Sequence, residues 1–292
     1  MAVAVARSRR GLKRIVVGPP HEAARDRSAR RLVPALAVLA VPLLIALAGP
    51  LFAGDAGPRG TSLTTGAGHW LGTDFTGRDV FREVLLGGRS VVTVAVAATA
   101  LTYAVALPVG FVCALTRRTW LEELLMRPLD VLLSVPSLLV VLLVAAVVQP
   151  GPAGLAVVVA CVGIPDAARL VRAAGAEAAS RPAVEALRMQ GESWARLALG
   201  YVGRSIGRTL AADTGVRLTG AVYLVATAAF LGVGVAPDAA DWAVMVDRNR
   251  TGLSVQPWAT VVPALLIVAL TMGGNLLADA ALTRPHRTEK NR

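Results

Sequence analysis

The chain has 292 residues, of which 55% are hydrophobic, and its mean hydropathy is +0.60. Soluble domains usually contain roughly 45–50% apolar residues, so this composition excludes an ordinary soluble protein. The net charge of +11 could indicate a nucleic-acid partner, but no segment between the apolar stretches is long enough for a basic soluble domain. The composition therefore predicts an all-α, polytopic membrane protein that binds no nucleic acid.

Six apolar segments are candidates for transmembrane helices, because about 17–25 apolar residues cross a bilayer. Five of the segments approach or exceed this length. The other one, residues 153–168, is short and carries Asp166, but it must cross if its neighbours are to alternate. The six predicted spans are residues 32–53, 91–115, 129–148, 153–168, 218–236 and 259–282.

The first span follows a basic tail, residues 1–31, and together they imitate a secretory signal that ends at Ala46-Leu47-Ala48. The apolar run exceeds the usual ~7–15 residues of a signal core and further spans follow, so we expect an uncleaved anchor at residues 32–53. The positive-inside rule sets the orientation. With the N-terminus in the cytoplasm, inner segments contain 24 of the 30 Lys and Arg residues, which also places the tail at 284–292 inside.

Residues 54–90 then form an extracytoplasmic loop before a core at residues 91–283. This loop contains the string His69-Trp70-Leu71-Gly72-Thr73-Asp74-Phe75-Thr76-Gly77-Arg78-Asp79-Val80. Its glycines and aspartates predict a turn that leads into a short amphipathic helix at residues 80–86. We expect Asp74, Arg78 and Asp79 to fix the turn through capping and ion pairs, with substrate contact as the alternative.

The predicted spans carry no ionisable group near their centres, since Asp130, Asp166, Arg169 and Asp279 lie near span ends. Ion-driven transporters usually contain such a group. The sequence also contains no Gly-x-x-x-x-Gly-Lys-[Ser/Thr] phosphate loop, so an ATPase that drives transport must be a separate chain. Cys113 and Cys161 lack neighbours at ligand spacing and are expected to be packing residues, and no metal site is predicted.

A polar, Arg-rich segment at residues 169–217 predicts two short helices joined at Gly191. We expect Ser180 to cap the first helix, Pro182 to lie in its first turn and Gly191 to end it in a left-handed conformation. A second helical run follows at residues 192–202. Two such helices at a membrane face form a knob that a soluble partner can bind. On a solvated helix, Glu185 is alternatively the ion-pair partner of Arg181 or Arg188.

The string Gly203-Arg204-Ser205-Ile206-Gly207 matches the Gly-x-Ser-x-Gly nucleophile elbow of serine hydrolases. It follows a predicted helix rather than a strand. His21 and His286 lie in the tails and His69 lies outside, so a folded base on the same side is missing. An intramembrane serine hydrolase is therefore the least favoured alternative, and no catalytic residue is predicted.

The chain resembles the permease subunits of peptide and nickel ABC importers, in particular their C-type subunit. The outer string carries the family signature, through Leu71, Gly72, Thr73, Asp74, Gly77, Arg78 and Asp79. The knob resembles the family's coupling loop, Glu-Ala-Ala-x-x-x-Gly, through Glu185, Ala186 and Gly191. Leu187 replaces the second Ala, and Tyr201, Gly203 and Arg204 stand where the family has Ile, Leu and Pro.

The resemblance implies the type I importer permease fold of six transmembrane helices, in a bacterial cytoplasmic membrane, with an ATPase-coupling loop at about residues 173–214. It implies a non-catalytic subunit that forms half of a translocation pathway for dipeptides or oligopeptides. The implied partners are a homologous B-type permease, one or two ATPase subunits that bind ATP and Mg, and an extracytoplasmic substrate-binding protein. In the sixth span, Asn275 and Asp279 either line the pathway or hydrogen-bond a neighbouring helix.

Two alternatives remain within this resemblance. The same architecture serves nickel or another small solute, and the sequence does not identify the substrate. The missing Ile-x-Leu-Pro end also leaves open a coupling-impaired permease that acts as a scaffold.

Overall fold

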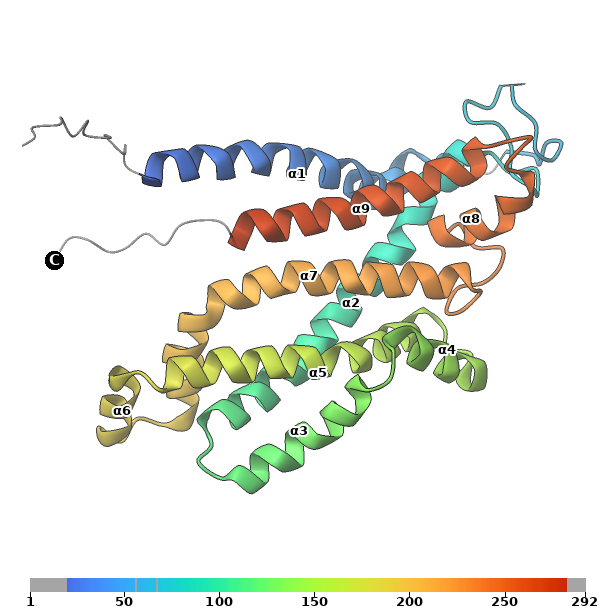
Figure 1. The fold of residues 1–292 in the computed structure, drawn as a ribbon. Coiled ribbons are helices and arrows are strands. Elements are labelled where there is room, and N and C mark those ends of the chain that lie inside the picture. Colours follow the sequence, from blue (N-terminus) through green and yellow to red (C-terminus); the bar gives the residue numbers. More distant parts are fainter. Residues whose placement is uncertain (1–19, 56, 67, 283–292) are drawn as a thin grey trace, which may run out of the picture.

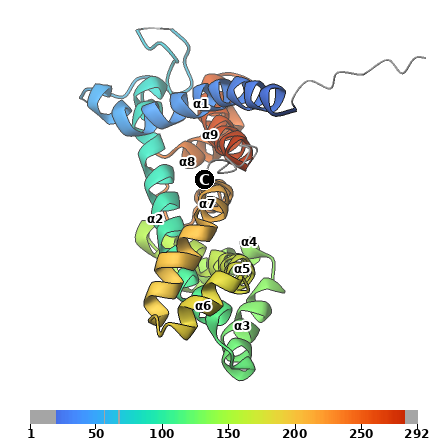
Figure 2. The same cartoon turned by 90° about the vertical axis from the view of Figure 1, so that its left-hand side faces the viewer.

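The structure is a computed structural model that describes residues 20–55, 57–66 and 68–282, and these ranges form helices and no strand. Long helices form a bundle, and the second of them crosses the others (Figures 1 and 2). They are α1 (Pro20–Phe52), α2 (Val80–Leu115), α5 (Pro152–Ala179), α7 (Gly203–Phe230) and α9 (Trp258–Leu282). Shorter helices lie between them: α3 (Thr119–Leu133), α4 (Ser137–Val148), α6 (Pro182–Met189) and α8 (Trp242–Asn249).

The all-α, polytopic architecture is confirmed. Four of the described helices are long and apolar enough to cross a membrane, namely α1 from Pro34, α2, α5 and α9. The bent pair α3 and α4 makes a fifth if it is one span. Helix α7 is not among them and carries Asp213 and Arg217. Length and composition therefore identify at most five membrane-crossing segments among the described residues, whereas six were predicted.

The predicted span at residues 129–148 is wrong as a single helix. Helix α3 ends at Leu133, α4 begins at Ser137, and the two helices meet at an angle of 85°. Pro136 stands at the break with ψ 128°, outside the helical region. A proline ring also disfavours helical geometry in the residue before it. Helix α3 therefore ends before Pro136, and a new helix, α4, begins after it.

Two other predicted boundaries are wrong because helices continue beyond the apolar runs. The short amphipathic helix expected at residues 80–86 is the first part of α2, which Asp79 caps by accepting from Phe81 N at 2.8 Å. Helix α5 continues past residue 168 to Ala179. Arg, Glu and Ala are good helix formers, so a helix does not stop where its apolar face ends.

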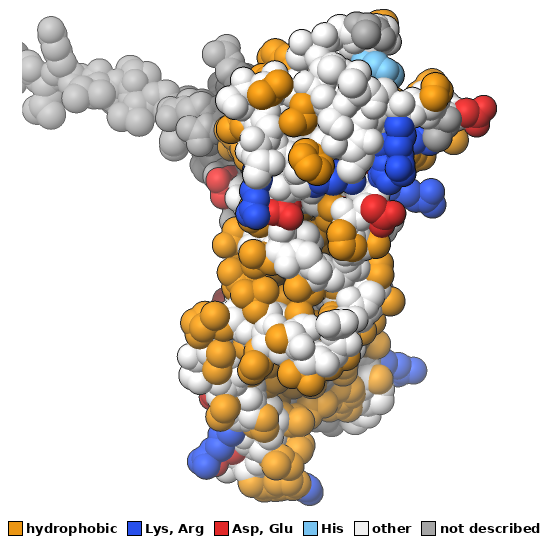
Figure 3. Space-filling model, turned by 90° about the vertical axis from the view of Figure 1, so that its right-hand side faces the viewer, with side chains coloured by type: hydrophobic (Ala, Val, Ile, Leu, Met, Phe, Trp, Pro, Cys, Tyr) orange, Lys and Arg blue, Asp and Glu red, His pale blue; other side chains and the backbone are white. Residues whose placement is uncertain are grey.

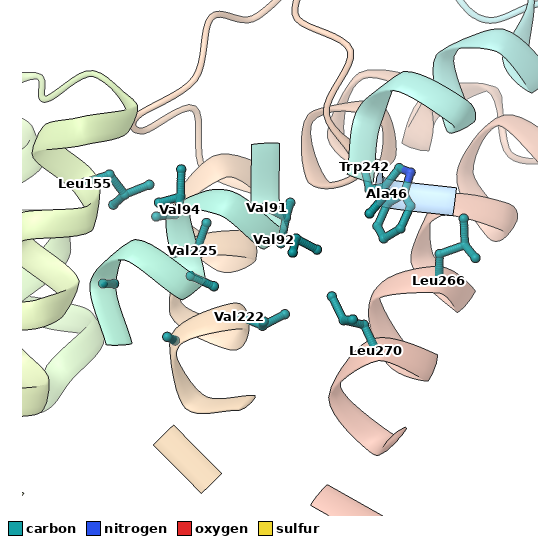
Figure 4. Packing of buried hydrophobic residues seen from close by; sticks show 14 of the residues in the cluster. Ala46, Val91, Val92, Val94, Leu155, Val222, Val225, Trp242, Leu266 and Leu270 are labelled. Atoms are coloured by element: carbon teal, nitrogen blue, oxygen red, sulfur yellow. The ribbon is translucent and has the colours of Figure 1, made fainter. Parts of the chain in front are cut away.

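The main core lies where α2 contacts α1, α5, α7, α8 and α9 (Figure 4). Trp242 is fully buried there, and its Nε1 donates to Val84 O at 2.8 Å. Glycines let the indole approach α2 closely, since a Cβ on Gly88 would lie 2.4 Å from the Trp242 ring. Small residues at a helix contact are common in membrane proteins for this reason.

The two ends of the bundle carry different elements (Figures 1 and 2). One end carries α6, the start of α1 and the end of α9. The opposite end carries α8 and the segment 54–79, except for residues 56 and 67. The predicted tails fall mostly outside the described residues: 1–19 and 283–292 are not described, while residues 20–31 belong to α1.

Candidate functional site

A buried ionic network ties the outer loop to the segment before α9. Asp74 is fully buried and accepts from Thr76 N and Arg78 N, both at 2.8 Å. The same carboxylate lies 2.8 Å from Arg248 Nη2, and Glu83, only 3% exposed, lies 3.5 Å from that atom. Arg248 therefore bridges two buried carboxylates. Figure 3 looks onto this end and shows charged side chains gathered above a hydrophobic surface.

Two neutral side chains extend the network. Asn249 Oδ1 accepts from Phe75 N at 2.8 Å, and Gln256 Nε2 donates to Leu71 O at 2.5 Å. Both amides are fully buried. The two residues of each hydrogen bond are 174 and 185 positions apart in the sequence. No local pattern signals such distant pairs, so the sequence did not predict the roles of Arg248, Asn249 and Gln256.

The remaining signature residues also make contacts within the outer end. Asp79 caps α2, and its Oδ2 lies 2.9 Å from His69 Nδ1. Arg78 donates from Nη1 to Asp238 O at 2.7 Å, and Thr73 donates from Oγ1 to Thr61 O at 2.6 Å. The structure thus places these side chains in caps, ion pairs and loop hydrogen bonds.

Gly72 and Gly77 occupy positions that only glycine fits. Their φ angles are 73° and 77°. An added Cβ would lie 2.1 Å from Gln256 Nε2 at Gly72 and 2.2 Å from Gly60 O at Gly77. Both the backbone conformation and the close approach therefore require glycine here.

Replacing Gly72 by alanine is expected to lower the thermal unfolding midpoint in detergent, because about 1–3 kcal/mol of backbone strain adds to the clash. Gly232→Ala is the matched control, since Gly232 has φ 79° but open space around its Cβ position. The unfolding midpoint of Gly232→Ala should fall only by the amount that backbone strain causes. Equal losses in both variants would mean that the contact with Gln256 contributes nothing.

Asp241, the N-cap of α8, gives the outer end a pH dependence. Burial raises the pKa of its carboxyl above the ordinary value. The folded protein therefore keeps the proton on this carboxyl up to a higher pH than the unfolded chain does. Stability is highest below the ordinary pKa, and it falls as the pH rises from there through the raised pKa of the folded state. Asp241→Asn keeps a capping side chain and removes this titration. We expect the unfolding midpoint of the variant to depend less on pH than that of the wild type across this interval.

At the opposite end, α6 and its exit form a compact turn. Gly191 has φ 80°, its N–H donates to Arg188 O at 3.0 Å, and Glu192 N donates to Leu187 O at 3.1 Å. This is the Schellman pattern, and it confirms the predicted left-handed end at Gly191. Pro182 lies in the first turn as predicted.

The predicted N-cap is wrong. Arg181 occupies the N-cap position of α6, while Ser180 ends α5 and donates its hydroxyl to Glu177 O at 2.8 Å. Helix α5 runs too far for Ser180 to begin the next helix. The second helical run is π-helical at Arg196–Val202 and continues directly into α7.

Glu185 pairs with Arg117 in the connection between α2 and α3, at 3.2 Å, and not with Arg181 or Arg188. Arg188 instead donates to Leu115 O at 3.4 Å. Ala186 is half-buried beside Glu185. Exposed side chains, including Met189 at 78% and Trp194 at 49%, surround this turn. In the structure, the exposed part of the predicted knob consists of α6 and residues 190–195, and the name refers to this part from here on.

The Gly-x-Ser-x-Gly string lies inside the first turns of α7. Ser205 is exposed and accepts from Arg181 Nη1 at 2.9 Å. A nucleophile elbow needs a strand before the serine, and the described residues around it are helical. Residues 203–207 therefore do not form a nucleophile elbow.

A charged pair lies in the middle of the bundle, where none was expected. Arg217 is half-way along α7, and its Nε donates to Asp213 Oδ2 at 2.6 Å. Tyr103 Oη on α2 donates to the same oxygen at 2.5 Å, and Arg217 Nη1 donates to Gly163 O on α5 at 3.4 Å. The exposed fractions of the Arg217 and Asp213 side chains are 14% and 10%.

Two predictions were therefore wrong: that Arg217 ends a cytoplasmic segment, and that the spans lack central ionisable groups. Asp213 and Arg217 are one turn apart and opposite in charge, so α7 carries them into the bundle as a neutral pair. Charged groups inside membrane proteins usually have a functional role. Asn275 and Asp279 lie elsewhere, exposed on α9.

These features define a helical membrane protein with a buried polar centre and an exposed knob at one end. Residues 106–285 match the family described as "Binding-protein-dependent transport system inner membrane component". The chain belongs to this family.

The chain is also similar to individual members. It is 30% identical over 213 residues to a protein of Brucella abortus biovar 1 that is named a peptide permease, covering 72% of this chain and 70% of that protein. It is 30% identical over 211 residues to the glutathione transport system permease protein GsiD of Escherichia coli O6:K15:H31, covering 72% and 69%.

The chain is thus a multi-pass ABC importer permease subunit of the inner membrane. The family implies a partner permease, an ATPase and a binding protein. The sequence argument for a separate ATPase began from spans without central ionisable groups, and the charged pair inside the bundle removes that premise. The expectation of a separate ATPase now rests on family membership.

Proposed function

We propose that this chain forms one half of the pathway through which an ABC importer moves dipeptides or oligopeptides into the cytoplasm. The names of the relatives support peptides over nickel or another small solute. The other half is a homologous B-type permease. A binding protein delivers the peptide from outside, and the ATPase subunits hold ATP and Mg. This subunit catalyses no covalent reaction.

The knob is the proposed ATPase contact, and its shape is the observation that carries the proposal. Val184 is fully buried and anchors α6, while Glu185, Met189 and Gly191 face outward. The knob shares its end of the bundle with the start of α1 and the end of α9 (Figure 1). With the termini and the knob in the cytoplasm, closure of the ATPase pair would push on α6 and rock the helices.

The first test is purification of the tagged chain from membranes of its own organism, followed by assays of vanadate-sensitive ATP hydrolysis and labelled dipeptide uptake. We expect ABC ATPase subunits to co-purify. Gly191→Pro should abolish stimulated hydrolysis, because proline cannot adopt φ 80° and lacks the N–H that bonds Arg188 O. Glu185→Ala should weaken coupling.

Matched variants separate coupling from folding. Gly191→Asn should keep coupling, since asparagine tolerates the left-handed conformation. Glu123→Ala, which removes an exposed carboxylate on α3, should behave as wild type. If ATPase subunits co-purify but peptide does not stimulate hydrolysis in the wild type, the chain is a scaffold. Uptake of labelled nickel in place of dipeptide would contradict the peptide assignment.

A further inference from the structure

A cavity of about 470 Å³ lies beside the central charged pair, bounded by α2, α4, α5 and α7. Its size is within the roughly 300–1,000 Å³ of small-molecule sites. The polar side chains that line it include Thr99, Thr102, Ser137, Asp166, Asp213 and Arg217. We call it the central cavity.

The charges of the central cavity do not balance. Asp213 and Arg217 neutralise each other. Asp166 is exposed and has no hydrogen-bond or ion-pair partner within the described part of the chain. The basic residue one turn away, Arg169, is held by Asp130 at 2.6 and 3.0 Å. One carboxylate therefore remains without a counter-ion and favours a cation.

The two threonine hydroxyl groups in the cavity also favour a hydrogen-bond donor. Thr99 donates its proton to Ala95 O at 2.8 Å, and Thr102 donates to Ala98 O at 2.9 Å. Since each donor is occupied, the free lone pairs of both oxygens can only accept. A ligand group with several N–H donors and a positive charge matches carboxylates and hydroxyl acceptors together.

We propose that the central cavity binds the α-ammonium group of the transported peptide, with the carboxylate of Asp166 as its principal counter-ion. This rests on the proposed function. Thr99 and Thr102 accept hydrogen bonds from the same group. Tyr103 and Arg217 hold the Asp213 carboxylate in position, so that it adds a second, already compensated acceptor. The site selects for a free amino terminus after the binding protein has released the peptide.

The test uses a cysteine placed in the cavity. Gly220 lines it and has nothing within 4 Å of its Cβ position, so Gly220→Cys fits without a clash. Cys113 and Cys161 are replaced by alanine. Membranes carrying this protein are treated with a cationic methanethiosulfonate, MTSET, or its anionic analogue, MTSES. Ala-Ala and N-acetyl-Ala-Ala, which differ in the ammonium group, are then tested for protection.

We expect MTSET to react faster by about tenfold or more relative to MTSES, because a charged cleft concentrates counter-ions. Asp166→Asn should abolish most of this preference, whereas Glu123→Gln, which removes an exposed carboxylate on α3, should not. Ala-Ala should slow labelling and N-acetyl-Ala-Ala should not. In uptake assays, Asp166→Asn should raise KM for Ala-Ala more than it lowers kcat.

Equal rates of the two reagents, or a preference that survives Asp166→Asn, would overturn the assignment. Equal protection by both peptides would also overturn it, since the ammonium group would then not be recognised. The reagent preference can be read in membranes even if no ATPase co-purifies. The binding site and the proposed transport function can therefore fail separately.

Discussion

Replacement of Arg248 by methionine is expected to destabilise the folded protein by about 3–5 kcal/mol, the usual cost of leaving a buried carboxylate, here that of Asp74, without its counter-ion. Asp74 is 0% exposed and Glu83 is 3% exposed, and both approach Arg248 Nη2 within 3.5 Å. Methionine keeps much of the side-chain volume and removes the charge. Asp74 then retains its backbone N–H donors but loses the only cation within 4 Å in the described residues, and the loop should separate from α8.

The control is Arg250→Met, two residues away. Arg250 is 64% exposed and pairs with Asp247 on the surface at 3.2 Å, an arrangement that contributes roughly 0–1 kcal/mol. Thermal stability can be compared by size-exclusion chromatography of detergent-solubilised protein after heating. A double variant, Arg248→Met with Asp74→Asn, should recover part of the loss. Similar midpoints for the two single variants would contradict the role of the ionic network.

The second large effect is expected at Trp242. Its replacement by alanine should cost about 3–5 kcal/mol, because the indole is fully buried and the surrounding helices can collapse only partly into the space. The change also removes the donor to Val84 O. Figure 4 shows the ring next to Ala46 of α1, in the core that also contains Leu266 and Leu270 of α9, so its loss should loosen α1, α2, α8 and α9 together.

Trp70→Ala is the matched control, since Trp70 is 89% exposed in the same outer end of the protein. Heating followed by size-exclusion chromatography again measures both variants without relying on tryptophan fluorescence. Trp242→Phe should fall between wild type and Trp242→Ala, because it keeps most of the volume and loses the hydrogen bond. A Trp242→Ala protein as stable as Trp70→Ala would show that the core does not depend on the indole.

Features that depend on local chemistry could be predicted from the sequence. Apolar runs predicted α1, α2, α5 and α9 as membrane-crossing helices. The left-handed end of α6 follows from the conformational freedom of Gly191. The outer string predicted a turn that Asp74, Arg78 and Asp79 hold through capping and ion pairs. Helix boundaries were less predictable, because α2 and α5 continue into polar sequence. The break at Pro136 did have a local signal, which the apolar composition on both sides obscured.

Interactions between distant segments could not be predicted. Arg248 is an ordinary basic residue in an outer loop until folding places it beside Asp74 and Glu83. Arg217 counted as a cytoplasmic charge because hydropathy evaluates residues one at a time, whereas Asp213 and Arg217 enter the bundle as a pair. The roles of Glu185, Ala186, Gly191, Asn275 and Asp279 in transport remain proposals that rest on the family.

Helix α2 connects the two ends of the molecule in a single element. Its 36 residues correspond to a length of about 54 Å, nearly twice the hydrocarbon thickness of a bilayer. The ionic network holds its first turn, and the residues just after its last turn include Arg117, the partner of Glu185. A tilt of about 5° around one end would therefore shift the other by about 5 Å, so α2 can act as a lever between the outer loop and the knob.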